Sequence, residues 1–255
     1  MPININKNAM NILQKFLSAH KKNYFIIGGH AAAYNLSLQG LSFRVTRDYD
    51  IVIVSEVEDE QFANDLAKLL ESGGYQFGYK SDNSKRTAYR FENPVDDNYP
   101  EIIEFFVKEG DYIQSIDNRF AKLNIVVDEE KIPAMVLNKD IYNFAKNHII
   151  EINELMFVDK PCLIALKSFA YFENLKLYRD KKVKSDDYKK HVRDILRIIG
   201  SFEEDELNPI NDLPDILKTT INDIVPVLTK SKEQLTAAGL DKDIVVYTVG
   251  SLINK

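Results

Sequence analysis

Cysteine is almost absent from this chain of 255 residues, and its scarcity excludes two ways of stabilising a fold. The single cysteine, Cys162, cannot form an internal disulfide. The sequence has no CxxC pair and no cluster of cysteine with histidine, so we expect no structural zinc site. We therefore expect a fold held by an ordinary hydrophobic core, in a reducing and cytoplasmic environment.

Long apolar runs and a surplus of basic residues are also lacking. No apolar stretch approaches the roughly 18 residues that a membrane span needs, so we expect no membrane partner. The first residues, MPININKNAMNILQKF, show no basic segment followed by an apolar one, so we expect no signal peptide. The net charge of −6 does not indicate nucleic-acid binding, although a local basic patch can act against a global acidic balance.

The hydrophobic pattern that is present divides the chain into an α/β half and a helical half. Apolar runs rich in β-branched and aromatic residues predict strands at 24–27, 48–54, 86–92, 101–107, 122–127 and 132–137. Helical spacing predicts helices at 8–20, 30–38, 58–72, 140–156, 163–178 and 188–202, and in the tail after Asp212. We therefore predict an α/β domain over residues 1–138 and a helical domain over residues 139–255, which gives an α+β fold for the whole chain.

Two aspartates, Asp48 and Asp50, stand at the start of the predicted strand DYDIVIV. On a strand they share one face and lie roughly 6.6 Å apart along the backbone. At an effective dielectric of about 20, two charges at that distance repel by roughly 2.5 kcal/mol. A positive partner is therefore expected between them, and a hard divalent cation prefers such oxygen ligands. The alternative is a solvated strand start, because the pattern D-x-D is common.

A third carboxylate strengthens the metal hypothesis. In EIIEFFV, Glu104 shares a strand face with Ile102 and Phe106. An acid at such an apolar position needs a partner, because burying an unpaired charge costs several kcal/mol. A neighbouring strand carrying the two aspartates would make Glu104 a third ligand of the same cations. The alternative is that Glu104 lies at a frayed strand end and that Glu101, Asp96 or Asp97 takes its place.

Two glycines, Gly28 and Gly29, follow the predicted strand at 24–27 and precede a predicted helix. A strand, two glycines and a helix leave backbone N–H groups at a helix N-terminus, which suits an anion such as phosphate. Glycine also lets a phosphate approach the main chain closely. Taken alone, the pair can equally be an ordinary turn.

The pattern GG-x-A…R-x-T-x-D-x-D resembles the DNA polymerase beta nucleotidyltransferase superfamily, in particular its branch of AbiEii-like toxins and related bacterial proteins. The matching residues are Gly28, Gly29, Ala31, Arg44, Thr46, Asp48 and Asp50. The order of strand, glycines, helix, D-x-D strand and later third acid is matched as well. The resemblance covers the first half of the chain and implies a nucleotidyltransferase-like mixed β-sheet flanked by helices, followed by a C-terminal helical domain.

The resemblance implies transfer of NMP from an NTP to a hydroxyl acceptor on RNA, protein or a small molecule. Asp48, Asp50 and Glu104 would bind two Mg²⁺ ions, and Glu104 would also help to deprotonate the acceptor. The turn at Gly28 and Gly29 would hold the triphosphate. A role as a toxin with an antitoxin partner is compatible with this activity.

Two departures from the family pattern bear on activity more than on fold. Family members commonly have serine after the first glycine, whereas this chain has Gly29 and then His30. His30 either contacts phosphate or is a half-buried residue of the first helical turn. The third acid of the family is usually aspartate, and here it is Glu104. The alternative function is therefore a binding or regulatory protein that kept the fold and lost the chemistry.

The helical half contributes two further candidates. Lys167 lies within an apolar helix face, and such a lysine either extends to water or meets a partner. In AbiEii-like relatives such a lysine is followed by a K-D-x-x-D string, whose nearest match here is Lys190-His191-Val192-Arg193-Asp194. The resemblance implies that Lys167 contacts the nucleotide phosphates and that Asp194 orients it. Asp194 can equally be an ordinary acid near a helix N-terminus.

The segment 176–193 is rich in lysine and arginine and contains Tyr178 and Tyr188. It suits binding of an RNA or nucleotide phosphate backbone, with stacking on the tyrosines. The interspersed acids Asp180, Asp186 and Asp187 reduce its positive charge, so a solvated connection between helices is the alternative.

Overall fold

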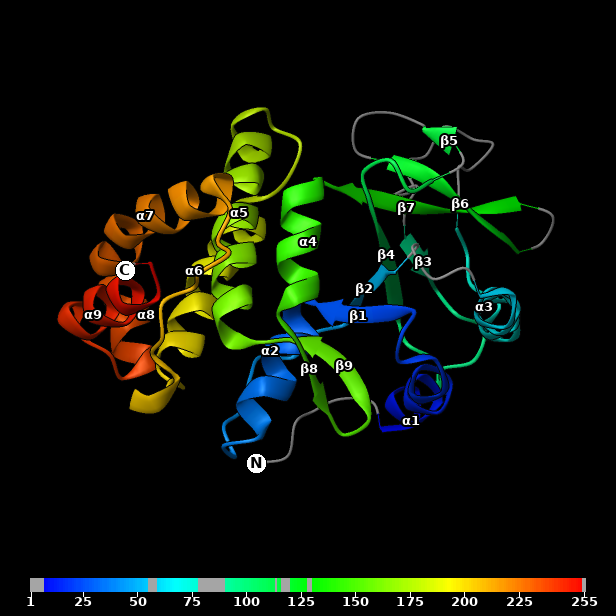
Figure 1. The fold of residues 1–255 in the computed structure, drawn as a ribbon, viewed down its shortest axis with the longest axis horizontal. Coiled ribbons are helices and arrows are strands. Elements are labelled where there is room, and N and C mark those ends of the chain that lie inside the picture. Colours follow the sequence, from blue (N-terminus) through cyan, green and yellow to red (C-terminus); the bar gives the residue numbers. More distant parts are fainter. Residues whose placement is uncertain are drawn as a thin grey trace. The chain divides into compact units, whose positions relative to one another are not determined.

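The computed structural model describes residues 7–54, 59–77, 90–112, 114–115, 120–127 and 130–253. The chain is an α+β protein with a mixed β-sheet flanked by helices (Figure 1). It divides into two compact units. The sheet unit comprises Met1–Ala31 and Arg44–Val158, and the helical unit comprises Ala32–Phe43 and Asp159–Lys255.

The sheet formed by the described strands has nine members, in the order β5-β6-β7-β4-β2-β1-β9-β8, with β3 paired to β4 outside this path. The strands are β1 (Tyr24–Ile27), β2 (Asp48–Ile53), β3 (Arg90–Glu92), β4 (Ile102–Lys108), β5 (Gln114–Ser115), β6 (Phe120–Val127), β7 (Glu130–Leu137), β8 (Ile149–Ile152) and β9 (Leu155–Val158). Strand β2 pairs antiparallel with β1 and parallel with β4. This central position explains why Ile51, Val52 and Ile53 are all buried.

The helices of the sheet unit are α1 (Lys7–Leu17), the 3₁₀ turn η1 (Ser18–His20), the start of α2 (Gly28–Ser37), α3 (Glu60–Gly73) and α4 (Lys139–Asn147). Helix α4 covers one face of the sheet, because its Tyr142 contacts Phe25 at 6.0 Å between ring centroids. Helix α1 lies on the opposite face, where Met10 Sδ is 3.5 Å from the hydroxyl of Tyr49. We call the face of Phe25 the acid face, because Asp48 and Asp50 alternate with Tyr49 and share it.

The structure corrects the helix predicted over 140–156. Only its first part forms α4, and the rest is the hairpin of β8 and β9. Both residues of the hairpin turn, Asn153 and Glu154, have positive φ angles of 50° and 64°, as a two-residue hairpin turn of the mirror-image class requires. Because β9 pairs parallel with β1, the segment 139–158 belongs to the sheet unit, whereas the sequence division was placed at residue 138.

Other predicted elements have the expected type. Strands β1, β2, β4, β6 and β7 and helices α1, α2 and α3 lie where the hydrophobic pattern predicts them, within a few residues. Of the strand predicted over 86–92, the last three residues form β3, and residues 86–89 lie outside the described residues.

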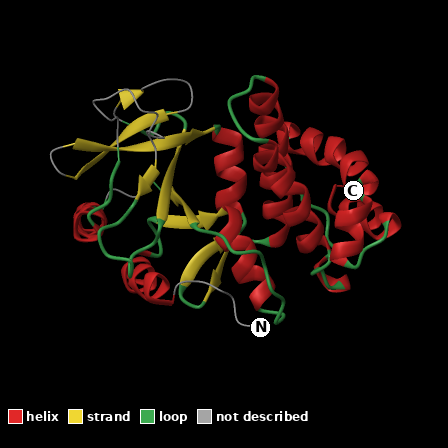
Figure 2. Ribbon diagram, turned by 180° about the vertical axis from the view of Figure 1, so that it is seen from behind, coloured by secondary structure: helices red, strands yellow, loops and turns green. Residues whose placement is uncertain are grey.

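The helical unit consists, beyond the end of α2, of α5 (Lys160–Arg179), α6 (Ser185–Ile199), the 3₁₀ turn η2 (Glu204–Glu206), α7 (Asp215–Lys230), α8 (Lys232–Ala238) and α9 (Lys242–Ile253). Its described residues contain helices and loops without strands (Figure 2). Helix α5 begins where the Asp159 side chain accepts a hydrogen bond from the N–H of Cys162 at 2.8 Å. Cys162 itself is completely buried, and this burial raises the pKa of its thiol well above the usual range.

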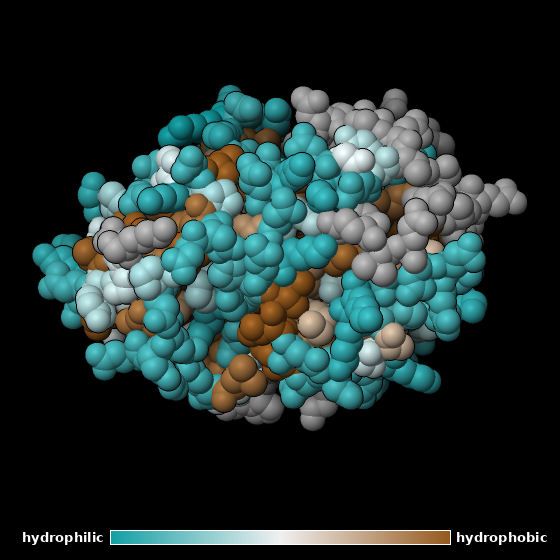
Figure 3. Space-filling view, viewed as in Figure 1, coloured by the Kyte–Doolittle hydropathy of each residue, from teal (hydrophilic) through white to brown (hydrophobic). Residues whose placement is uncertain are grey.

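None of the helices in the described parts of the chain is both long and apolar enough to cross a membrane. On the face drawn in Figure 3, hydrophilic residues cover most of the surface, and hydrophobic residues form smaller patches between them.

Candidate functional site

The glycine turn and the second aspartate lie against each other in the sheet unit. Gly28 follows β1 directly and has a φ of 72°, which favours glycine. A Cβ atom at Gly28 would lie 1.8 Å from Oδ2 of Asp50, so a side chain here would displace the carboxylate. At Gly29 a Cβ atom would lie 2.4 Å from Oγ1 of Thr46. The missing side chains therefore create the space that these two polar groups fill.

The acids are aligned by strand register. Asp50 is the register partner of Ile27 in β1 and of Glu104 in β4, and Glu104 is in turn the partner of Arg90 in β3. Directly paired residues on neighbouring strands project to the same side of a sheet. Asp50, Glu104 and Arg90 therefore form a lateral row on the acid face. Asp48, two residues before Asp50, projects to the same face.

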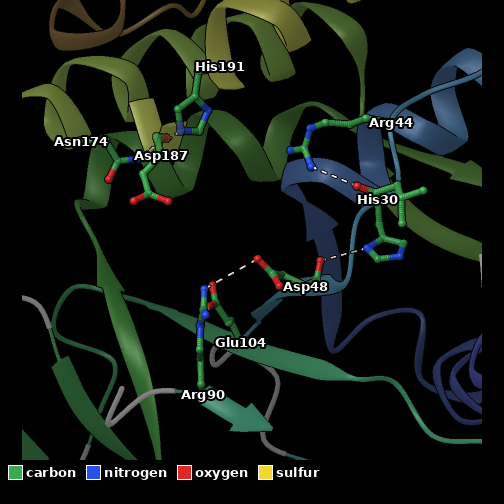
Figure 4. Close-up of polar contacts among 9 residues, drawn as sticks. His30, Arg44, Asp48, Arg90, Glu104, Asn174, Asp187 and His191 are labelled. Carbon is green, nitrogen blue, oxygen red and sulfur yellow. Dashed lines mark hydrogen bonds and ion pairs between the residues drawn. The ribbon is translucent and has the colours of Figure 1, made fainter. Parts of the chain in front are cut away.

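The guanidinium of Arg90 contacts two of the three acids. It forms a hydrogen-bonded ion pair from Nε to Oε1 of Glu104, and its Nη2 is 3.7 Å from Oδ2 of Asp48 (Figure 4). The side chain of Glu104 is only 7% exposed, whereas those of Asp48 and Arg90 are 31% and 30% exposed. The sequence predicts a positive group beside the aspartates, and Arg90 is such a group at Asp48.

Arg90 is the residue that sequence reasoning missed. It was part of a predicted strand and had no assigned role. The sequence feature that could have identified it is a charged residue next to the apolar Phe91 in a short strand. Such a residue predicts a partner of opposite charge on a neighbouring strand. That partner could be identified only once the register of β3 against β4 was known.

His30 is buried in the first turn of α2 and is 1% exposed. Its Nδ1–H donates to the backbone carbonyl of Asp48 at 2.9 Å (Figure 4). Its ring stacks on Tyr49 with 3.6 Å between centroids. Burial lowers the pKa of His30 to about 4, so the ring is neutral at pH 7. The sequence left two alternatives for His30, contact with phosphate or burial in the first helical turn. These contacts agree with burial in the first helical turn. The ring supports the strand start at Asp48 from below the acid face.

Arg44 and Thr46 lie in the segment between α2 and β2, which has neither helical nor strand structure. Arg44 is half-buried, and its Nη1 donates to the backbone carbonyl of Val45 at 3.4 Å. Its positive charge also acts to lower the pKa of His30, so the two side chains are electrostatically coupled. The predicted nucleotide-binding residues of this segment therefore belong to the same part of the sheet unit as Asp48.

The predicted metal ligands, which we call the carboxylate set (Asp48, Asp50 and Glu104), have the chemistry that Mg²⁺ prefers. They supply carboxylate oxygens from the adjacent strands β2 and β4. The absence of a side chain at Gly28 leaves room for the carboxylate of Asp50. The guanidinium of Arg90 is a cation that contacts the other two acids, Asp48 and Glu104. Within the described ranges, no three side chains of Asp, Glu, His or Cys are close enough together to form a ready-made metal site.

The lysine pair, Lys167 and Asp194, lies in the helical unit and links α5 to α6. Lys167 Nζ is 2.8 Å from Asp194 Oδ2, and the two side chains are 5% and 1% exposed. Lys167 also lies over the ring of Phe43, 5.8 Å from its centroid. Of the two alternatives for the lysine, these contacts describe one that meets a partner. Asp194 lies in the middle of α6 and not in its first turn, so it is not an ordinary N-terminal helix acid.

His191, the second residue of the string from Lys190 to Asp194, contacts α5. Its Nε2 accepts from Asn174 Nδ2 at 3.0 Å, and the same amide is 3.4 Å from the carbonyl of Asp187 (Figure 4). Nearby, the rings of Tyr178 and Tyr188 in the basic segment pack at 5.2 Å between centroids. RNA binding by this segment stays a prediction.

The predicted site residues thus form two groups. The sheet unit brings together Gly28, Gly29, His30, Arg44, Thr46, Asp48, Asp50 and Glu104, and the helical unit brings Lys167 to Asp194. Comparisons with protein-family models, with curated proteins and with solved structures found no match.

Proposed function

We propose that this protein is a metal-dependent nucleotidyltransferase that moves NMP from an NTP to a hydroxyl acceptor. The observation that carries the proposal is the contact between the glycine turn and the carboxylate set. Gly28 packs under the carboxylate of Asp50, and Asp50 is aligned in register with Glu104. A phosphate-sized anion site at the start of α2 would therefore adjoin a set of three acids.

Each residue has a defined role in this proposal. The carboxylate set would hold two Mg²⁺ ions, which when bound favour the deprotonated acceptor hydroxyl and stabilise charge on the leaving pyrophosphate. The backbone N–H groups at Gly28 and Gly29 would bind the triphosphate, with Arg44 and Thr46 beside them. Neutral His30 would hold the start of β2 in place through the Asp48 carbonyl.

Lys167 and Asp194, in the helical unit, have a role that rests on the resemblance alone. The ammonium of Lys167 would face the nucleotide phosphates, and Asp194 would orient it. The short contact between Lys167 Nζ and Asp194 supports the orienting role. The acceptor would be RNA, a protein or a small molecule, and a cytoplasmic toxin with an antitoxin partner is the biological role that we propose to test first by growth arrest on expression.

The test is transfer of radiolabel from each α-labelled NTP to total RNA or to lysate in the presence of Mg²⁺. We expect labelling by the wild type and loss of at least about a hundredfold in Asp50→Ala, since that carboxylate acts only through the metal. A thermal melt supplies a second readout, because Mg²⁺ with the preferred NTP should raise the melting temperature of the wild type more than that of the variant.

Glu104→Gln and Glu101→Gln form a matched pair for the third acid. Glu104 is buried on the acid face, whereas Glu101 is exposed and pairs with Arg47 at 3.0 Å. We expect Glu104→Gln to lose transfer and Glu101→Gln to retain it. The reverse result would assign the third ligand to Glu101, which is the alternative that the sequence left open.

A second candidate function is a nucleotide-binding or regulatory protein on the same fold without turnover. Two observations favour it. Arg90 contacts two of the predicted metal ligands, and Gly29 stands directly after the first glycine, where family members commonly present a serine hydroxyl. An NTP that stabilises the wild type without any transfer of label would support this candidate over the enzyme.

A further inference from the structure

Arg90 occupies a specific position in the acid face. It lies directly opposite Glu104 in the antiparallel pair of β3 and β4, and its guanidinium also reaches Asp48 on β2. A single side chain thus connects three strands through two carboxylates. Arg47, by contrast, pairs with Glu101 at the exposed surface.

The chemistry explains why a cation is needed here. Glu104 is buried, and Asp50 is its direct neighbour in the parallel register with β2. A buried carboxylate beside another acid is unfavourable unless a positive group compensates it. A guanidinium suits this task because it is always charged and its planar donors match carboxylate oxygens.

The same chemistry explains why this cation can be replaced. Arg90 carries one positive charge and contacts two carboxylates, those of Asp48 and Glu104, so it balances one of their two negative charges. The contact to Asp48, at 3.7 Å, is longer than a hydrogen bond, and the arginine side chain is partly exposed. A divalent cation carries twice the charge and prefers oxygen ligands, so it competes for the same atoms.

We propose that Arg90 is an exchangeable counter-ion of the carboxylate set. Its guanidinium neutralises Asp48 and Glu104 until a divalent cation takes its place, and it then leaves both carboxylates. This inference rests on the proposed function only in naming Mg²⁺ as the physiological cation. It gives Arg90 a positioning role, because the residue sets the affinity for metal and keeps the acids in place when the metal leaves.

The test measures binding of Mn²⁺, as a spectroscopic substitute for Mg²⁺, to the full chain without nucleotide. Electron paramagnetic resonance reports the free Mn²⁺, and Arg90→Gln is compared with the wild type and with Arg47→Gln as the matched control. Because Arg90→Gln removes the competing charge, we expect its Kd for Mn²⁺ to fall on the order of tenfold, with Arg47→Gln unchanged. A purely structural arginine would give the opposite sign, since its loss would disorder the ligands and weaken binding.

Thermal melts of the same proteins, with and without Mn²⁺, provide a second measurement whose direction the proposal predicts. Without divalent cation, Arg90→Gln should melt below the wild type, because Glu104 loses its partner, and Mn²⁺ should restore more of the melting temperature in the variant than in the wild type. Equal or weaker Mn²⁺ binding by Arg90→Gln would overturn the proposal, and so would the absence of Mn²⁺ binding in both proteins.

A measurement on the wild type covers the case in which the variant fails to fold. In ¹⁵N spectra, the Nε–H signal of Arg90, assigned with Arg90→Lys, should shift as Mg²⁺ is added, while that of Arg47 stays in place. A stationary Arg90 signal under saturating Mg²⁺ would refute the exchange. Label transfer by the wild type with a stationary signal would refute the exchange alone, whereas a shift without transfer by any NTP would refute the proposed function alone.

Discussion

The carboxylate set of the sheet unit and the lysine pair of the helical unit hold charge in opposite ways. Lys167 and Asp194 are sealed from solvent and joined by a 2.8 Å contact. The carboxylate set combines three acids with Arg90 on a partly exposed sheet face. Both contain a buried acid with a basic partner, but in the carboxylate set one arginine contacts two acids.

The difference indicates what each group is suited to do. A sealed pair in which each charge satisfies the other gains nothing by changing partner, so it fixes the geometry of α5 against α6. A partly exposed set in which one arginine contacts two acids has room to bind a further cation. If the lysine pair also takes part in the reaction, it does so with the ammonium of Lys167 held in one position by Asp194. The carboxylate set would instead exchange Arg90 for a divalent cation and back again.

The largest expected effect is on the lysine pair. Asp194→Ala should lower the free energy of unfolding by about 3–5 kcal/mol, because it leaves the Lys167 ammonium buried without its partner. Urea unfolding measures the loss. Asp186→Ala, in the same helix, removes an exposed contact to Arg193 and should cost about 1 kcal/mol or less. Equal losses in the two variants would show that the lysine pair is not sealed in solution.

The next effect concerns the space that glycine leaves for the carboxylate set. Gly28→Ala should cost about 2–4 kcal/mol, because it adds a Cβ atom at positive φ and displaces the Asp50 carboxylate. Gly40→Ala is the control, since Gly40 has a similar φ of 69° but nothing within 4 Å of the added atom. The excess of the first loss over the second, measured by urea unfolding, reports the contact with Asp50.

A smaller effect should appear with pH, through the histidine that supports Asp48. The pKa of His30 is about 4 in the folded protein, below the usual 6.5, so the unfolded chain binds more protons between these values. Stability that is fully present above pH 6.5 should therefore fall as the pH drops toward 4, by about 1 kcal/mol per unit. His30→Gln should remove this part of the pH dependence, as unfolding curves across this range would show. An unchanged slope would mean that folding does not lower the pKa of His30.

The smallest expected effect is on Asp50. Without divalent cation, Asp50→Asn should change the free energy of unfolding by less than about 1 kcal/mol, since loss of one charge relieves repulsion with Glu104 while the side chain keeps its size. With Mg²⁺ and an NTP, the wild type alone should gain melting temperature. A large destabilisation without cation would instead make Asp50 a structural residue like Asp194.

Much of the fold was predictable because strand and helix periods are local properties of the sequence. The hairpin of β8 and β9 was missed because its apolar residues also fit a helical period and its turn is Asn-Glu, without the glycine that usually marks such a turn. Arg90 was missed for a different reason. Its partner Glu104 lies fourteen positions away, and only strand register reveals that they meet. Sequence reasoning identified the acids, but not the basic residue that contacts them.

Local unfolding of the helical unit near the start of α5 can be measured through Cys162, without an engineered label. Its thiol is completely buried near the start of α5 and, with its raised pKa, holds little of the reactive thiolate. A disulfide reagent can modify it only when this helix is exposed, so the rate of modification under native conditions counts opening events. As the chain has no second cysteine, every modified molecule reports on this one region. The reaction rate would thus follow the helical unit separately, while the sheet unit contributes no signal.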